Sequence, residues 1–406
     1  MIRPFDVAKD SQNAIRIWKE VGWHVEGSDQ VMIDYLNPPT ALVAEINGDA
    51  ECLVAHTPAS LRYGTSDLPL CIIGGVTTSL VARKQGLAAR VLAQMLANRA
   101  LAGEPVATLG MFEQGFYDRL GFGTSSYENR VNFDPALLNV PGKYRAPIRI
   151  AKEEFEEMHA ARLTRLMTHG NVTLDFLPAT KLETETSTNG FGLGYRDKSG
   201  KIGHHLWFET DDIESGPLKV KWMNYRNRAE FHDLLHILRS FGEQIYIVKM
   251  AEPPLVQFQD LLIQPFKHRR ITAGGSFVSE MKTRAPFQFR MLDIETCVEA
   301  VKSPVEVAFN LTLADPISDF LPDDAAWQGL AGDYVVKFGT KSSVEQGSIG
   351  ILPTLKTTVG AFTRLWLGVR PASFLAMTDD LDAPDELLKQ LDSAITVHNP
   401  QTGWDY

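Results

Sequence analysis

A short basic turn before a helix carries the clearest chemical signal in this 406-residue chain. The apolar, β-branched run of residues 72–81 indicates a strand, and the apolar spacing after Gly86 indicates an amphipathic helix. Arg83 and Lys84 lie between these two elements. The first N–H groups of a helix have no intrahelical acceptor and carry partial positive charge, so this turn suits an anion such as pyrophosphate. An ordinary turn with two solvated cations is the alternative.

A tyrosine motif follows the turn by about thirty residues. It occupies residues 115–123, reads Gly-Phe-Tyr-Asp-Arg-Leu-Gly-Phe-Gly and contains Tyr117. Together with the spacing Arg83-x-x-Gly86-x-Ala88, this motif resembles the GNAT-type N-acetyltransferases. The resemblance implies that the turn binds the pyrophosphate of the co-substrate acetyl-CoA, and that Tyr117 protonates the departing thiolate.

The requirements of acyl transfer agree with these implied roles. The acceptor ammonium must lose a proton, the tetrahedral oxyanion must be stabilised, and the leaving thiolate must be protonated. A phenol with a pKa of about 10 is a weak acid, but it suits a thiolate leaving group in a dry site.

Composition sets limits on the class of protein. The hydrophobic content of 44% and charged content of 22% are ordinary for a globular chain of two to four domains. A net charge of −10 argues against a nucleic-acid partner and is compatible with a cationic acceptor. Cys52, Cys71 and Cys297 are too few and too scattered to predict a disulfide framework or a metal site. With neither a signal peptide nor an 18-residue apolar run, we expect a cytoplasmic protein without a membrane partner.

The elements around the turn predict an α/β domain. We expect a helix over residues 11–21 with Asp10 or Ser11 as its N-cap. The other expected elements are strands over residues 40–46, 51–56, 70–81, 106–109 and 127–133, and a helix over residues 114–120.

Two further α/β regions follow a predicted linker at residues 139–143. The second has expected helices over residues 152–166 and 231–241 and strands over residues 206–210, 218–222 and 244–248. It loosely repeats the first region but lacks a basic glycine turn. The third has expected strands over residues 308–313 and 332–338 and helices over residues 294–301, 358–367 and 384–396.

Three such regions, an active turn only in the first and an aromatic C-terminus resemble the enhanced-intracellular-survival (Eis) acetyltransferases. The resemblance implies an α/β (α+β) fold of two tandem GNAT-like mixed sheets and a sterol-carrier-protein-like C-terminal domain. The corresponding domains are residues 1–138, 145–286 and 287–406. It also implies a homo-hexamer.

The same resemblance implies that Tyr117 is the general acid and that the C-terminal carboxylate of Tyr406 is the general base. Trp404 and Tyr406 are large rings that we expect to be buried rather than frayed in solvent. Gly110 stands where a histidine often lines the acceptor pocket, so we expect a wider pocket. The residues implied to hold acetyl-CoA are Val76, Thr77, Thr78, Arg83, Lys84, Gln85, Gly86, Leu87, Ala88, Ala89, Phe112 and Glu113.

The sequence leaves the acceptor open among an aminoglycoside, a polyamine and a lysine side chain. A non-catalytic CoA- or lipid-binding protein on the same scaffold is the alternative function. We expect Trp18 in the core and Trp23 at the acceptor pocket. The remaining candidates are interpreted as structural or solvated residues: His204, His205, His232, His236 and the basic run at residues 267–270.

Overall fold

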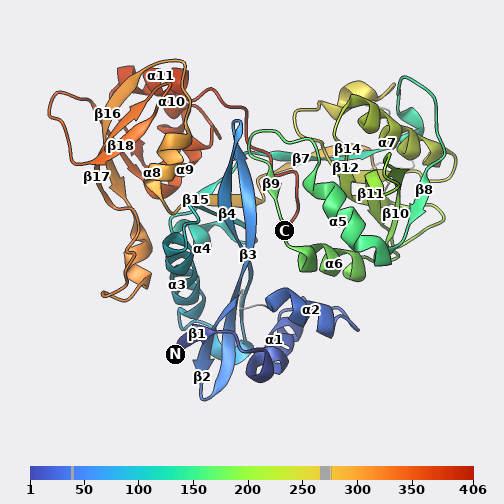
Figure 1. Cartoon of the computed structure of the whole chain (residues 1–406), viewed down its shortest axis with the longest axis horizontal. Coiled ribbons are helices and arrows are strands. Elements are labelled where there is room, and N and C mark those ends of the chain that lie inside the picture. Colours follow the sequence, from blue (N-terminus) through green and yellow to red (C-terminus); the bar gives the residue numbers. More distant parts are fainter. Residues whose placement is uncertain (38–40, 266–274, 276) are drawn as a thin grey trace. The chain divides into compact units, whose positions relative to one another are not determined.

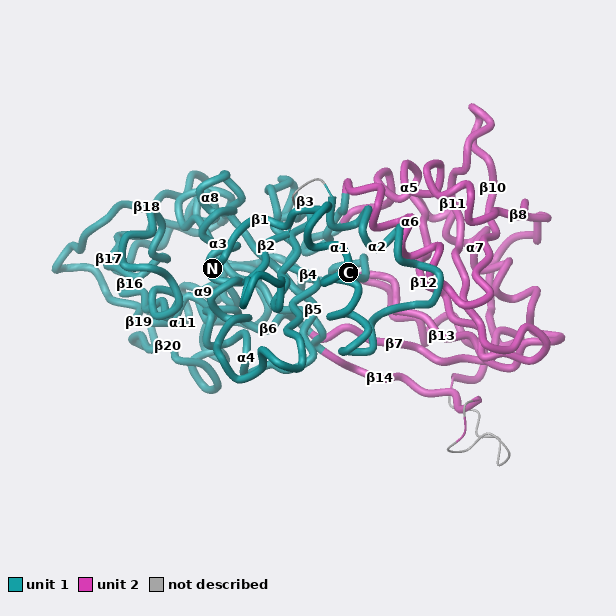
Figure 2. The backbone as a smooth tube through the Cα atoms, turned by 90° about the horizontal axis from the view of Figure 1, so that it is seen from below, with its two compact units in different colours: residues 1–126, 168–174, 285–406 teal, residues 127–167, 175–284 magenta. Residues whose placement is uncertain are grey.

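The computed structural model describes residues 1–37, 41–265, 275 and 277–406. The chain divides into two compact units, and both contain segments from distant parts of the sequence (Figure 2). Unit 1 comprises residues 1–126, 168–174 and 285–406, and unit 2 comprises residues 127–167 and 175–284. Both units combine helices with β-sheets, which confirms the predicted mixed α/β class.

The main sheet of unit 1 has the strand order β1-β2-β3-β4-β5-β15-β6, with β9 beside β3 (Figure 1). Only β4 and β5 are parallel, and all other neighbours are antiparallel. The strands are β1 (Ile2–Pro4), β2 (Ala41–Ile46), β3 (Asp49–Tyr63), β4 (Ser66–Thr78), β5 (Val106–Gly110), β6 (Gly123–Thr124), β9 (Val172–Thr173) and β15 (Phe287–Met291).

The first helices of unit 1 are α1 (Val7–Glu20), α2 (Asp29–Leu36), α3 (Leu87–Leu101) and α4 (Gln114–Asp118). Helix α3 packs its Val91, Leu92 and Leu96 into a core that includes apolar residues of β2 to β5. The expected N-cap of the first helix is wrong, because Asp6 caps α1 by accepting from the N–H groups of Ala8 and Lys9. Asp10 is instead buried in an ion pair with Arg3.

Unit 1 also contains a five-stranded sheet with the order β18-β17-β16-β19-β20. Its strands are β16 (Val307–Ala314), β17 (Gly332–Phe338), β18 (Ser343–Gln346), β19 (Thr354–Thr358) and β20 (Leu381–Asp382). The accompanying helices are α8 (Ile294–Ala300), α9 (Val359–Trp366), α10 (Ala372–Leu375) and α11 (Asp385–Ala394). Strands β16 and β17 and helices α8, α9 and α11 agree closely with the elements expected from residue 294 onward, whereas β18, β19, β20 and α10 were not expected.

Unit 2 is built on a seven-stranded sheet with the order β14-β7-β13-β12-β11-β10-β8. Its strands are β7 (Glu128–Phe133), β8 (Ile148–Ile150), β10 (Phe191–Arg196), β11 (Ile202–Glu209), β12 (Leu218–Asn224), β13 (Val248–Ala251) and β14 (Glu280–Arg284). The helices are α5 (Phe155–Leu163), α6 (Leu177–Thr186) and α7 (Arg228–Ser240). Leu234, Leu235 and Leu238 of α7 pack in a core with Leu206 and Phe208 of β11.

The compact units differ from the three expected regions at two strands. Strand β7, expected to close the first region, pairs with β13 and β14 of unit 2. Strand β15, at the start of the third region, lies between β5 and β6 in the main sheet of unit 1. The division into residues 1–138, 145–286 and 287–406 therefore stays a prediction. No helix in the described part of the chain combines the length and apolar character needed to cross a bilayer.

Candidate active site

The site begins where β4 and β5 stop pairing. Their parallel ladder runs from Leu70–Val106 to Ile73–Leu109, and β4 continues to Thr78 without β5. On its other side, β4 has an irregularity opposite β3 between Leu53 and Ala55, so Gly75 and Val76 have no ladder partner. Strand backbone groups are thereby available at this edge, as the expected role of residues 76–78 requires. Val76 and Thr78 are half-buried and Thr77 is buried.

The predicted anion site lies at the N-terminus of α3, directly after β4 (Figure 1). Gly86 is the N-cap residue with a left-handed φ of 70°, and no side chain caps the helix. A Cβ at Gly86 would meet no atom within 4 Å, so a ligand can approach the backbone closely. Arg83 and Lys84 are exposed, and neither forms a hydrogen bond or ion pair within the described residues. Uncapped N–H groups beside two exposed cations have the character that an anion site needs, and anion binding at this turn stays a prediction.

Neighbouring segments hold this turn in place. The carboxylate of Glu20, at the end of α1, accepts from the N–H of Leu80 at 2.7 Å. Arg90 of α3 donates to the carbonyl of Gln85 at 3.1 Å. Leu87 and Ala88 are half-buried and Ala89 is buried against the sheet. The turn therefore presents its N–H groups from a fixed backbone.

Tyr117 lies on the short helix α4, which follows the end of β5. The residue is 2% exposed, and burial raises the pKa of its phenol to about 12. Edge contacts with three phenylalanine rings surround it, at centroid distances of 4.9 Å for Phe116, 6.2 Å for Phe122 and 6.3 Å for Phe112. Its phenol therefore stays protonated across the physiological range and can serve as a proton donor.

Phe112 and Glu113 lie directly before α4, the helix that carries Tyr117. Phe112 is 77% exposed, which is unusual for a phenylalanine and leaves its ring open to a ligand. Glu113 caps α4 by accepting from the N–H of Gly115 at 3.0 Å. The structure thus gives Glu113 a local role in forming the helix that carries Tyr117.

Sequence reasoning missed the residues of β15 that hold the Tyr117 helix. Arg290, fully buried, donates to the carbonyl of Leu120 at 2.6 Å and to Asp315 at 2.5 Å. A Cβ at Gly121 would lie 1.7 Å from Arg290, and Gly121 also has a φ of 79°, so only glycine fits this turn. Gln288 donates to Asp118 at 2.6 Å. A strand 170 residues later in the chain therefore fixes the end of α4.

The C-terminal tail lies against unit 1 along a defined path. The hydroxyl of Ser126 donates to the carbonyl of Pro400. Asn171 donates to the carbonyl of Gln401 at 2.7 Å, and the N–H of Val172 donates to the carbonyl of Thr402 at 2.8 Å. Trp404 is 4% exposed, which confirms its predicted burial.

The tail ends beside β5. The Tyr406 hydroxyl lies 2.8 Å from the hydroxyl of Thr108, and its ring packs on Phe287 with centroids 4.7 Å apart. A Cβ on Gly110 would lie 3.0 Å from a terminal oxygen of Tyr406. The main-chain oxygen of Tyr406 thus lies beside Gly110, and the expected widening of an acceptor pocket by Gly110 stays a prediction. Gly110 is the last residue of β5, and α4, which carries Tyr117, begins four residues later.

Residues 168–174 form the segment that holds the tail, and this role was not predicted from the sequence. This segment interrupts unit 2 in sequence but belongs to unit 1, where β9 pairs with Ser60 and Leu61 of β3. Asn171 is 1% exposed, and its side-chain amide donates to the carbonyl of Gln401.

Among the other candidates, Trp18 lies beside the end of β4, where its ring is 3.8 Å from a Cβ placed at Gly75. In unit 2, His205 is fully buried between Gly203 and Trp222, and His204 contacts Asp233, in agreement with structural roles. In unit 1, Trp18 is 4% exposed and Trp23 is 48% exposed, so the core position of Trp18 is confirmed. The basic run at residues 267–270 is outside the described residues.

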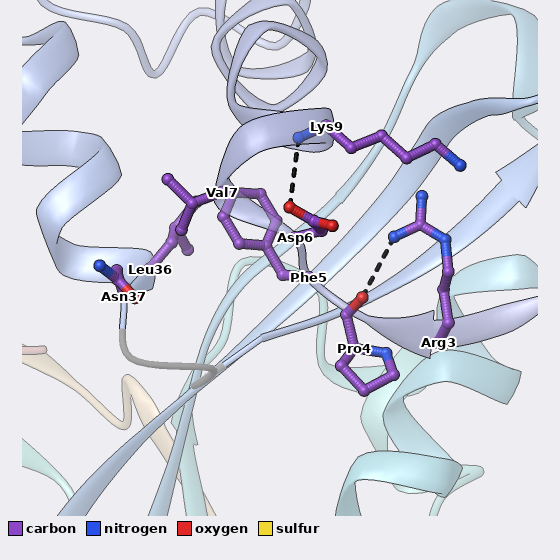
Figure 3. A pocket seen from close by; sticks show the side chains of 8 residues that line it. All are labelled: Arg3, Pro4, Phe5, Asp6, Val7, Lys9, Leu36 and Asn37. Atoms are coloured by element: carbon purple, nitrogen blue, oxygen red, sulfur yellow. Dashed lines mark hydrogen bonds between the residues drawn. The ribbon is translucent and has the colours of Figure 1, made fainter.

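A pocket of about 570 Å³ lies near the N-terminus, lined by Arg3, Pro4, Phe5, Asp6, Val7, Lys9, Leu36 and Asn37 (Figure 3). Its cations are already neutralised, because Arg3 pairs with Asp10 and Glu45 and Lys9 pairs with Glu45. None of the predicted catalytic or cofactor residues lines it, so the pocket adds nothing to the candidate active site.

Comparisons with known proteins identify the first part of the chain. Residues 2–125 match the acetyltransferase (GNAT) domain family. An uncharacterized N-acetyltransferase of Streptomyces avermitilis is 28% identical over 228 residues, which are 51% of this chain and 54% of that protein. The match therefore spans about half the length of this curated relative.

Solved structures resemble the whole chain in fold. A probable N-acyltransferase of Enterococcus faecalis superposes with a TM-score of 0.79 at 15% identity, covering 100% of this chain and 99% of that one. Eis1 of Mycobacterium abscessus superposes with a TM-score of 0.77 at 15% identity, covering 100% of both chains.

Fold, turn and family match together define a GNAT-type acetyltransferase domain at residues 2–125. The chain that surrounds this domain has the fold of Eis1 along its full length. Residues 2–125 are therefore assigned to the GNAT acetyltransferase domain family, and the whole chain resembles Eis1 in fold.

Proposed function

We propose that this protein is an acetyl-CoA-dependent N-acetyltransferase that acts on a primary amine of a cationic acceptor. Three observations support the proposal: α3 begins at Gly86 without a side-chain cap, Tyr117 is buried with a raised pKa, and a main-chain oxygen of Tyr406 lies beside Gly110 at the end of β5. Acetyl-CoA supplies the activated acetyl group. Its pyrophosphate matches the N–H groups of α3 with Arg83 and Lys84, and the unpaired backbone at Val76 can hold the acetyl carbonyl.

In the proposed reaction, Tyr406 accepts a proton and Tyr117 donates one. The Tyr406 carboxylate takes a proton from the acceptor ammonium, directly or through a water, and the freed amine attacks the acetyl carbonyl carbon. The new C–N bond forms, the C–S bond breaks, and the departing thiolate takes the phenolic proton of Tyr117. The nitrogen then still carries one proton more than an amide and gives it to the tyrosinate, directly or through a water, while the carboxylate releases its own proton to solvent.

The acceptor class follows from charge. A net charge of −10 and a carboxylate at the site favour a cationic amine, of the aminoglycoside, polyamine or lysine type. Thiol release measured with a panel of amines tests this class, and activity confined to neutral or acidic amines would contradict it.

The Tyr117→Phe variant tests the proposed acid. Loss of the phenolic proton should lower turnover by roughly 10²–10⁴, the usual range for a positioned acid. The buried ring stays in place, so acetyl-CoA binding and the unfolding midpoint should change little. Unchanged turnover in a folded variant would remove Tyr117 from the mechanism, and absence of thiol release from the unmodified protein with every amine would favour a non-catalytic CoA-binding protein.

Two further features of Eis-like proteins extend to this chain as proposals. We infer a sterol-carrier-protein-like domain at residues 287–406, whose C-terminus completes the active site, and assembly into a homo-hexamer. Light scattering tests the assembly, since a single species at the chain mass of 45.1 kDa would contradict it.

A further inference from the structure

Three side chains with metal-binding atoms converge elsewhere in unit 1. They are His56 on β3, Cys71 on β4 and Glu104 in the loop between α3 and β5, and their ligand atoms lie within 4.8 Å of one another. His56 Nε2 lies 3.1 Å from a carboxylate oxygen of Glu104. The cluster was invisible in the sequence because its members come from three separate segments.

The sheet fixes the relative positions of the first two residues. Cys71 is opposite Pro58 and Ile73 is opposite His56, so His56 and Cys71 project from the same face. This face is covered by α3, since Cys71 and Ile73 share a core cluster with Val91, Leu92 and Leu96. The loop after α3 then places the carboxylate of Glu104 beside His56 and Cys71. Three ligands on rigid elements give a preorganised site.

The chemistry of the three groups suits zinc. Zn²⁺ binds thiolate, imidazole and carboxylate ligands in a tetrahedron, at about 2.3 Å to sulfur and about 2.0–2.2 Å to nitrogen or oxygen. Ligand atoms at such bond lengths lie roughly 3.3–3.8 Å apart. The observed separations are within 4.8 Å, so small side-chain rotations suffice.

A second observation points to a missing ligand. Oxygen Oε2 of Glu104 is buried and has no hydrogen-bond partner, although a buried carboxylate oxygen normally has one. The side chains of His56 and Glu104 are 7% and 14% exposed, and Cys71 is fully buried. The cluster is therefore shielded, and Glu104 lines the remaining access from solvent.

We propose that His56, Cys71 and Glu104 bind one Zn²⁺ ion, with a water molecule at the fourth position. The thiol of Cys71 releases its proton to solvent on binding, and the thiolate and carboxylate together balance the two charges of the ion. Arg99, whose Nη1 lies 3.7 Å from the same carboxylate, can stay beside this neutral cluster. The ion would join the C-terminal end of α3 to β3 and β4, away from the helix end with the phosphate turn. It would act on stability and not on acetyl transfer.

Cobalt titration of the full-length, chelator-treated protein tests this site. Co²⁺ bound through a thiolate gives a sulfur-to-metal charge-transfer band, which Zn²⁺ should abolish by displacement. The band should be absent in Cys71→Ser, and at least about tenfold more Co²⁺ should be needed in Glu104→Gln or His56→Gln. Cys52→Ser is the matched control, since Cys52 is equally buried on the neighbouring strand β3 and is not in the cluster.

Thermal unfolding gives a readout that does not depend on activity. Zn²⁺ should raise the unfolding midpoint of the unmodified protein and of Cys52→Ser, but not of Cys71→Ser or Glu104→Gln. If Cys71→Ser does not fold, Glu104→Gln carries the comparison. A missing band in the unmodified protein, or a band that persists in Cys71→Ser, would overturn the proposal.

Discussion

At the residue scale, the hydroxyl of Thr108 links the tail to the main sheet. It donates to the carbonyl of Gln288 at 2.9 Å, so it must accept from the Tyr406 hydroxyl 2.8 Å away. The ring of Tyr406 is thereby held next to Phe287 while its carboxylate lies beside Gly110. Tyr406 thus supplies a structural anchor through its side chain and, under the proposed mechanism, a base through its C-terminal carboxylate.

Thr108→Val and Tyr406→Phe each remove this hydrogen bond but keep the terminal carboxylate. A bond of this kind contributes about 1 kcal/mol, so each variant should lose roughly fivefold in kcat/KM because the carboxylate is less well held. The double variant should lose no more than either single variant. Thiol-release kinetics on the four proteins measure this coupling, and fully additive losses would show that the two hydroxyls act separately.

The residue types at the candidate site were largely predictable from the sequence, whereas the residues that hold the site and the tail in place were not. Arg83, Gly86 and Tyr117 follow local rules of strand, turn and helix start, and the structure places them accordingly. Arg290 and Asn171 could not be found in this way, because their partners at Leu120 and Gln401 are 170 and 230 residues distant in sequence. Nothing in the local pattern around either residue identifies such a partner.

At the element scale, helices and long strands were predicted well, and their pairing was not. The helices expected over residues 231–241 and 384–396 differ from α7 and α11 by only a few residues at their ends. In contrast, β15 inserts beside β5, and the strand expected over residues 244–248 begins only at its last residue, Val248. Periodicity reports which face of an element is apolar, but it does not identify the partner strand.

A buried histidine on β11, which pairs with β12, makes the stability of unit 2 depend on pH. His205 is fully buried, accepts from Trp222 at 3.0 Å, and burial lowers its pKa to about 4 from 6.5. The folded state therefore binds this proton less readily than the unfolded state. The resulting stability is complete above pH 6.5 and is lost as the pH falls toward 4.

The free energy of unfolding of unit 2 should accordingly be lower at pH 5 than at pH 7.5. Its total decrease should reach about 3 kcal/mol near pH 4. Tryptophan fluorescence during urea unfolding follows this change, since Trp207 and Trp222 stack in unit 2 with centroids 5.6 Å apart. A His205→Gln variant that still folds should show a smaller pH effect. An equal effect in both proteins would assign the acid sensitivity to other groups.

At the scale of the whole molecule, we propose that Tyr406 completes the site formed by residues 2–125. A C-terminal affinity tag converts the carboxylate of Tyr406 into a neutral amide and fills the space beside Gly110. We expect such a tag to abolish thiol release while leaving the fold intact, and an N-terminal tag to have no effect. Enzymatic removal of the C-terminal tag down to Tyr406 should restore activity. Full activity with that tag attached would reduce the tail to a packing element.

The hydrogen bond between Thr108 and Tyr406 spans 298 residues, and this separation has a consequence during protein synthesis. The side chain of Thr108 is made early in synthesis, whereas Tyr406 and strand β15, which lies between β5 and β6, are added much later. During that interval β5 has an unpaired edge, which can pair with a strand of another chain. The domain at residues 2–125 therefore cannot complete its sheet before β15 has been made.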